Sequence, residues 1–246
     1  MLDAGEDAGT PIDVGVDAFA TATDAGRDAF VATDAGHDAF VPMPDAGQDA
    51  GHDAAVSGSC ALTHMVISEV RTRGVAGAGD EFVELYNPTS AAIVLDATYT
   101  LSVRSSAAAT YTPRWAGTGQ SVGAHRHFLI TGANYTQTPG ADAALSSGIT
   151  DAGSIVLYQG TMAMDAVCFA FDATSTAAID STYVCEGTPA MSPHDNSTSA
   201  MSNSDRSLER RPGGALGHCM DTGVSASDFV TITPATPLDL ASLPTP

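Results

Sequence analysis

The sequence has 246 residues, with nine arginines, no lysine and 29 acidic residues, and its formal net charge is −20. Binding to nucleic acid phosphates or to anionic lipid rests on neutralisation by Lys and Arg, so this balance excludes nucleic acid as a partner of the whole chain. No run of 18 or more apolar residues occurs, and we therefore expect no transmembrane segment.

Residues 1–59 are a repeat with a period of ten, clearest where Thr23–Ala32 is followed by Thr33–Pro42. This stretch holds 12 of the acidic residues and one basic residue, Arg27. Too few apolar side chains occur to offset chain entropy, and like charges extend a chain, so we predict a disordered acidic Asp-Ala-Gly stalk. The aspartate spacing matches neither an EF-hand loop nor a calcium-binding nonapeptide, which favours a spacer over a calcium site.

From Cys60 onward the pattern changes to short segments with β-strand character, separated by turn residues. We predict strands over 64–70, 82–86, 92–95, 99–103, 127–131, 154–158, 165–169, 207–210 and 228–232. Strands at intervals near ten residues, without a convincing amphipathic helix, predict an all-β antiparallel sandwich. We assign it to residues 60–237, with a long loop at about 186–205. A Pro-rich tail over 238–246 is expected to lie along the surface or to fray.

The strand 82–86 alternates with period two. Val83 and Leu85 are expected in the core, and Glu84 on the opposite face. Glu84 is interpreted as structural, either exposed or accepting hydrogen bonds from backbone or arginine. Glu81 shares the face of Val83 but is expected to stay hydrated at the start of the strand.

Four cysteines, Cys60, Cys168, Cys185 and Cys219, lie in the predicted domain, and none forms a C-x-x-C pair. This argues against a zinc knuckle or a thioredoxin-like site. Two disulfides formed in an oxidising compartment are the simplest explanation, and the alternative is four thiols in a cytosolic protein. Of the three pairings we favour Cys168–Cys185, which closes a short excursion, and Cys60–Cys219, which clamps the ends of the domain. Export then requires a signal upstream of Met1, which can carry a lipid anchor.

Candidate chemistry is sparse. A serine hydrolase needs an exposed nucleophile, a histidine and a carboxylate, and here Ser and His occur together only by abundance, so we assign no catalytic residue, no cofactor and no enzymatic activity. His125 and His127 share one face of a strand, but no H-E-x-x-H helix supports them, and we interpret both as rim or packing residues. His194 and His218 are isolated in the sequence and are assigned to no site, so we predict no metal centre.

A group of aromatic and basic residues offers one ligand platform. We identify Tyr111, Arg114, Trp115 and Tyr135 as candidates for stacking against a sugar, because sandwich-type binding modules use such side chains. The alternative is that Trp115, the only tryptophan, fills a gap in the core.

Several segments in a shared order resemble a known family. Ile67–Val70 and Asp80–Thr89 resemble the opening strands of a lamin tail domain, and Asp165–Val167 and Ser207–Arg210 resemble its later segments. The resemblance covers about 64–237 and implies an immunoglobulin-like sandwich, usually without catalysis, on secreted or envelope proteins of bacteria. The Asp-Ala-Gly leader resembles the stalks of bacterial lipoproteins.

The function implied is a non-catalytic, exported or cell-surface structural or binding module that meets a protein or glycan at the cell envelope. One alternative is a carbohydrate- or envelope-binding module that uses loop aromatics. A second alternative is an accessory subunit of a secreted hydrolase.

Overall fold

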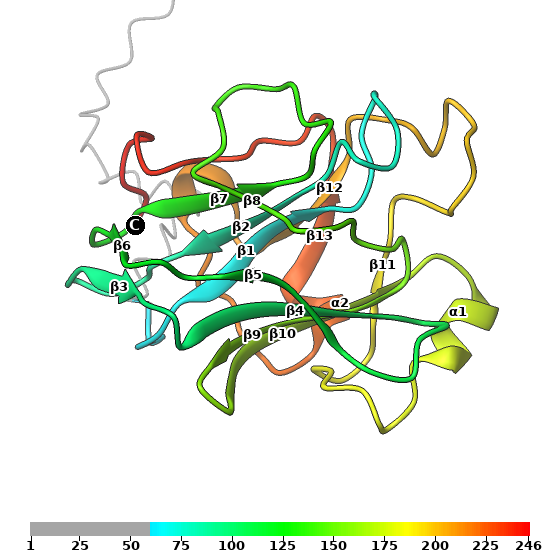
Figure 1. Ribbon diagram of the computed structural model, residues 1–246, viewed down its shortest axis with the longest axis horizontal. Helices are drawn as coiled ribbons and strands as arrows, with labels where there is room; N and C mark the ends of the chain where they lie inside the picture. Colours follow the sequence, from blue (N-terminus) through cyan, green and yellow to red (C-terminus); the bar gives the residue numbers. More distant parts are fainter. Residues whose placement is uncertain (1–59) are drawn as a thin grey trace, which may run out of the picture. The chain divides into compact units, whose positions relative to one another are not determined.

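The computed structural model describes residues 60–246, which form two packed β-sheets with a few short helices (Figure 1). The predicted all-β sandwich is therefore confirmed. Six strands make sheet A, in the order β13-β12-β1-β2-β7-β8, and five make sheet B, in the order β11-β10-β9-β4-β5. A separate ribbon pairs β3 with β6. The predicted stalk over 1–59 lies outside the described residues.

Within sheet A the strands are β1 (Val66–Arg71), β2 (Phe82–Tyr86), β7 (His127–Thr131), β8 (Ala143–Ala144), β12 (Ser207–Arg210) and β13 (Phe229–Ile232). Sheet B contains β4 (Tyr99–Ser105), β5 (Thr112–Ala116), β9 (Gly153–Gln159), β10 (Met162–Ala170) and β11 (Ala190–Met191). The remaining elements are β3 (Ile93–Leu95), β6 (Gln120–Val122), α1 (Ala173–Ala178), α2 (Ser225–Asp228) and the 3-10 turn η1 (Gly214–Leu216). All pairings are antiparallel except the two-residue pairings β7–β8 and β10–β11.

The nine predicted strands are all present, and their ends differ from the predicted ends by at most three residues. Four further strands, β5, β6, β8 and β11, were not predicted. Pro113 and Arg114 interrupt the apolar pattern of β5. A proline is tolerated there because β5 is the edge strand of sheet B, and on the side away from β4 its backbone has no neighbouring strand to which an N–H must donate. The others are three residues long or shorter, too short to show a period.

The core lies between the two sheets and follows the alternation of the strands. Val83 and Leu85 of β2 face it from sheet A, as predicted, and Leu101 and Ile155 face it from sheet B. All four side chains are fully buried. Burying a side chain of this size contributes roughly 1.5–3 kcal/mol, so this layer is the main stabilising feature.

Glu81 departs from expectation. It was predicted to stay hydrated at the start of β2, but it is 2% exposed. Its Oε2 accepts a hydrogen bond from the Ile149 N–H at 2.6 Å. Burial of this carboxyl raises its pKa from 4.5 to about 7, although Ile149 and Arg114 act in the opposite direction. The loop before β9 covers Glu81 and excludes the water that would otherwise reach a side chain at the start of a strand.

An ion pair joins the two sheets. Arg210 of β12 donates to both carboxylate oxygens of Asp165 of β10 at 2.7 Å, and both side chains are fully buried. Asp165 also accepts from the Ile67 N–H at 2.5 Å, next to an irregularity in the β1–β2 register. The Arg210 guanidinium lies 4.7 Å from the centre of the Phe229 ring. A buried, charge-assisted pair of this kind fixes the relative position of the sheets.

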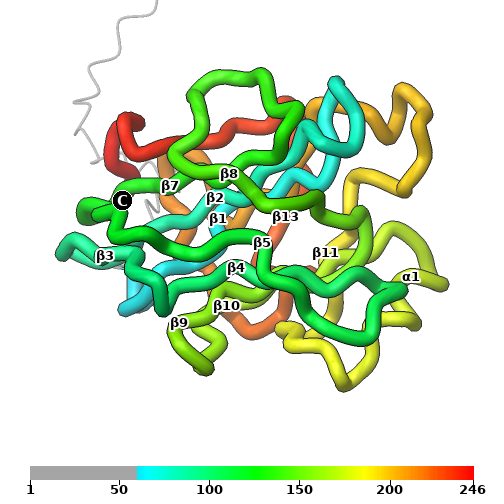
Figure 2. Tube along the Cα trace, viewed as in Figure 1, coloured from blue at the N-terminus to red at the C-terminus, as the bar shows by residue number. Residues whose placement is uncertain are grey.

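The four cysteines form the disulfides Cys60–Cys219 and Cys168–Cys185, the pairing favoured from the sequence. The segment after β13, residues 234–246, does not fray but runs along sheet A beside β7 (Figure 2). Residues 238–246, set apart above as a tail, thus belong to the same compact unit as the sandwich.

Candidate functional site

Three glutamates form a row across the outer face of sheet A. Glu209 of β12, Glu69 of β1 and Glu84 of β2 are cross-strand neighbours. Their residues are only 7%, 1% and 1% exposed, respectively. Like charges directly opposite one another are destabilising, and buried carboxylates are costly, so this row needs compensation from what covers it.

Segment 234–246 provides part of that compensation. The Thr236 N–H donates to Glu69 Oε1 at 3.1 Å, and the Leu238 N–H donates to Glu84 Oε2 at 2.5 Å. The Leu240 N–H donates to Asp142 at 3.0 Å. From Thr236 to Leu240, every second backbone N–H thus donates to an acidic side chain. In a β-sheet, these N–H groups would donate to the carbonyl groups of a neighbouring strand.

The three glutamates titrate differently. Burial raises the pKa of Glu69 to about 7, and burial together with the charge of Glu69 raises the pKa of Glu84 well above its usual value. For Glu209, burial acts to raise the pKa, but hydrogen bonds from His218 and Gly214 outweigh it and lower the pKa. The row therefore combines carboxyl groups that favour the protonated form with one that favours the charged form.

Two histidines lie beside this row. His127 Nε2 is 3.2 Å from His218 Nδ1 and 3.6 Å from Glu84 Oε1. On its other side, His218 Nε2 is 3.3 Å from Glu209 Oε1. Burial and the neighbouring His218 lower the pKa of His127 to about 3, so this ring is neutral at physiological pH. Tyr86 stacks on His127 with ring centres 4.7 Å apart.

This cluster corrects the sequence-based assignment of the histidines. His218 was considered isolated, but the fold brings it against His127, 91 residues away in the chain. His125 and His127 were expected to share a face, but His125 precedes β7 with a φ of 57° and approaches the Tyr86 hydroxyl instead. The nearness of His127 to Glu84 follows from the pairing of β2 with β7. No sequence signal places His218, which lies in a loop.

The predicted aromatic platform is not assembled. Trp115 is 7% exposed and packs against Phe128, with ring centres 5.4 Å apart, so it is part of the core. The Tyr111 hydroxyl donates to Ser154 on sheet B, whereas Tyr135 packs edge-on against Phe82 of sheet A. Arg114 precedes Trp115 on β5 and is half-buried. The alternation of β5 turns Trp115 inward, and the two tyrosines lie against different sheets.

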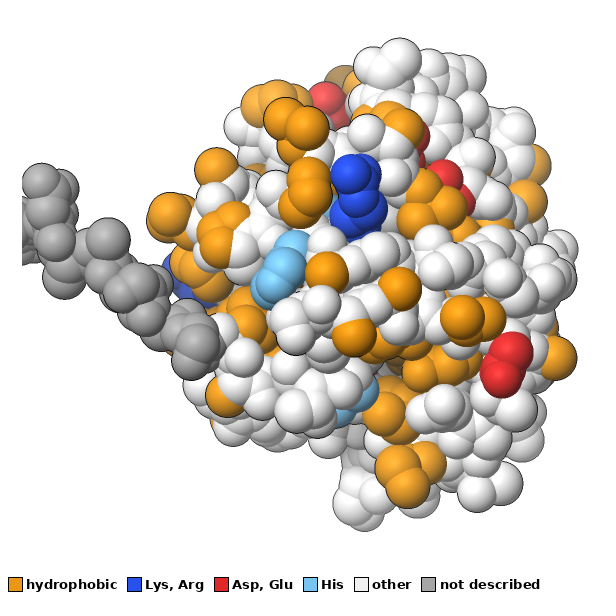
Figure 3. Space-filling model, turned by 90° about the vertical axis from the view of Figure 1, so that its left-hand side faces the viewer, with side chains coloured by type: hydrophobic (Ala, Val, Ile, Leu, Met, Phe, Trp, Pro, Cys, Tyr) orange, Lys and Arg blue, Asp and Glu red, His pale blue; other side chains and the backbone are white. Residues whose placement is uncertain are grey.

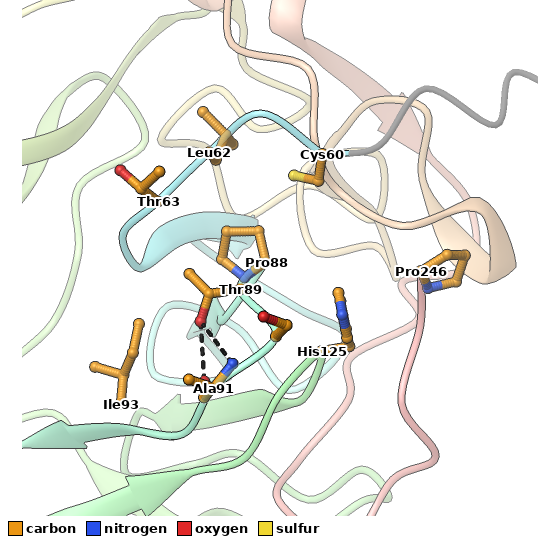
Figure 4. A pocket seen from close by; sticks show the side chains of 10 residues that line it. Cys60, Leu62, Thr63, Pro88, Thr89, Ala91, Ile93, His125 and Pro246 are labelled. Carbon is orange, nitrogen blue, oxygen red and sulfur yellow. Dashed lines mark hydrogen bonds between the residues drawn. The ribbon is translucent and has the colours of Figure 1, made fainter.

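An open groove of about 930 Å³ lies at the end of the sandwich near β3 (Figure 4). Its walls come from residues 60–63, from the turn 88–93, and from His125 and Pro246. Leu62, Pro88 and Ile93 give it an apolar lining. Figure 3 shows that hydrophobic and uncharged side chains predominate on this side, with few acidic ones, although the chain as a whole is strongly acidic.

No family model and no curated protein matches the chain. Among solved structures, a DUF4876 family protein from Bacteroides thetaiotaomicron matches with a TM-score of 0.41 and 10% identity, over 74% of this chain and 72% of that one. Between residues 60 and 246, no helix is both long enough and apolar enough to cross a membrane.

Proposed function

We propose that the protein is an exported, non-catalytic structural or binding module of the lamin-tail type, displayed at the cell envelope on the acidic repeat. The observation that carries the proposal is the sandwich closed by two disulfides, Cys60–Cys219 and Cys168–Cys185. Disulfides persist in oxidising compartments, which supports a position outside the cytoplasm.

The state of the polar side chains supports a non-catalytic role. Glu84 and His127, which have the residue types used in acid–base chemistry, are 1% and 0% exposed. Glu84 is engaged by Ser68 and Leu238, and the ring of His127 is covered by Tyr86. A general acid or base must reach the proton it transfers, and these groups are closed off from any substrate in solution.

The position of the protein tests the proposal directly. Intact mass and non-reducing peptide maps of the native protein, from culture supernatant and envelope fractions, are expected to show an extracellular chain with two disulfides. A cytosolic chain with four free thiols would overturn the export proposal.

The groove is the first surface to test for binding, because an apolar hollow on a weakly charged face can bury an apolar ligand. Purified full-length protein should co-sediment with an envelope preparation from the native source. Ala91→Arg, which places a charge in the groove, should reduce retention, whereas Met162→Arg at the exposed start of β10 should not. Equal retention of both variants would exclude the groove as the contact surface.

A further inference from the structure

Three potential metal ligands converge on one point beneath segment 234–246. Glu84, His127 and His218 each offer one ligand atom, these atoms all lie within 4.8 Å of one another, and all three residues are buried. The histidine nitrogens are 3.2 Å apart, and His127 Nε2 is 3.6 Å from the carboxylate oxygen. Around a tetrahedral zinc ion, with bonds of about 2.0–2.1 Å, the ligand atoms lie about 3.4 Å apart. The observed separations fall on either side of that value.

The charge around this point favours a cation. Within residues 60–246, no arginine forms an ion pair with Glu69, Glu84 or Glu209. A buried carboxylate without a positive partner carries a large desolvation cost, and it must either take up a proton or find a cation. A divalent ion bonded to Glu84 would offset that cost for Glu84 and for its neighbour Glu69.

The surrounding groups orient two of the three ligands, Glu84 and His218. Ser68 Oγ donates to Glu84 Oε1 at 2.5 Å, and the Leu238 N–H holds the second oxygen. Glu209 Oε1 lies 3.3 Å from Nε2 of His218. This contact leaves the other ring nitrogen, Nδ1, facing His127. A carboxylate behind a histidine is the usual outer partner of a ligating imidazole. Within residues 60–246, His127 Nδ1 has no hydrogen-bond partner, so this ring lacks the outer partner that Glu209 gives His218.

We propose that Glu84, His127 and His218 bind one divalent transition-metal ion, with zinc the best fit, as a structural site. Two imidazoles and a carboxylate suit zinc, whereas calcium and magnesium take oxygen ligands. The ion joins β2 and β7 to the loop that carries His218, beneath the segment that Leu238 anchors to Glu84. The site stabilises the module and is independent of what the groove binds.

Metal analysis of the full-length wild-type protein tests the site. The chain is unfolded in denaturant with its disulfides intact, refolded with zinc, and freed of loose metal by brief exposure to EDTA and gel filtration. We expect one zinc per chain and a Tm higher than that of protein refolded without metal. Refolding with cobalt should give the visible absorption of a tetrahedral ion. Absence of retained metal, or of any Tm shift, would overturn the proposal.

Variants distinguish this cluster from the acidic repeat, which offers carboxylates of its own. His127→Gln and His218→Gln should each abolish the retained zinc and the Tm shift, and Glu209→Gln should weaken binding about 10- to 100-fold. The matched control is His64→Gln, because within the described part of the chain His64 bonds only to the Met65 carbonyl, and it should retain one zinc. Full zinc retention in both His127→Gln and His218→Gln would refute the assignment.

A measurement on the wild-type protein covers the case in which these variants do not fold. X-ray absorption at the zinc edge should show two imidazole ligands with the remaining ligands oxygen. A shell made of oxygen alone would place the ion elsewhere and refute the site.

Discussion

Glu84 of β2 lies directly opposite Glu69 of β1, with both carboxyl groups buried on the outer face of sheet A beneath segment 234–246. Backbone N–H groups of that segment reach both side chains. A pair that would repel on an exposed sheet is therefore held by the donors above it. The same pair explains why the segment after β13 is ordered although it forms no strand.

Two substitutions of Glu84 should separate its role as a hydrogen-bond acceptor from the effect of its charge. In Glu84→Ala the Ser68 hydroxyl and the Leu238 N–H lose their acceptor, and we expect a loss of about 1–3 kcal/mol in urea unfolding without added metal. Glu84→Gln keeps an acceptor oxygen and cannot ionise beside Glu69, so its loss should be smaller. A larger loss in the glutamine variant would show that the charge itself is stabilising.

The pair Asp165–Arg210 should be among the most sensitive in the molecule. Asp165→Ala leaves a buried guanidinium without its partner, and we expect a loss of about 3–5 kcal/mol in the free energy of unfolding. In Asp165→Ala/Arg210→Met neither charge of the pair remains, so part of the stability should return. If the double variant is as unstable as the single one, the unpaired charge is not the cause.

Glu81 predicts a specific dependence of stability on pH. Its pKa is raised in the folded state from 4.5 to about 7, mainly by burial. The folded protein therefore holds this proton more tightly, so the contribution is fully present below pH 4.5 and is lost as pH rises through about 7. Relative to Glu81→Gln, the wild-type protein should lose up to roughly 3 kcal/mol over this window. Urea midpoints measured at intervals from pH 4 to pH 8 test this, and parallel curves would contradict it.

Trp115 should behave as a core residue. Trp115→Ala removes a ring that packs against Phe128, and a loss of about 3–5 kcal/mol is expected for a truncation of this size. Thermal unfolding measures the loss, and Tyr111→Ala, which truncates a half-buried tyrosine, is the comparison. A variant that unfolds like the wild-type protein would return Trp115 to the list of candidate surface residues.

Much of the fold is determined by local pattern. Alternation in Phe82–Tyr86 repeats every two residues and predicts which side chains face the core, whereas His127–Thr131 is located by its run of apolar residues. The count and placement of the cysteines in the predicted domain likewise indicate two disulfides. Edge strands such as β5 were missed because an edge tolerates Pro113, which weakens the local signal.

The candidate site was decided by tertiary structure. His127 meets His218 across 91 residues, and Leu238 meets Glu84 across 154. No periodicity links residues so distant, because the contacts depend on how a loop and an extended segment pack on a finished sheet. The sequence by itself determined that the strand beginning at Phe82 has a core face and an outer face. Only the packing of segment 234–246 decided that the outer face is buried, and only the loop after β12 decided that two histidines and a carboxylate meet there.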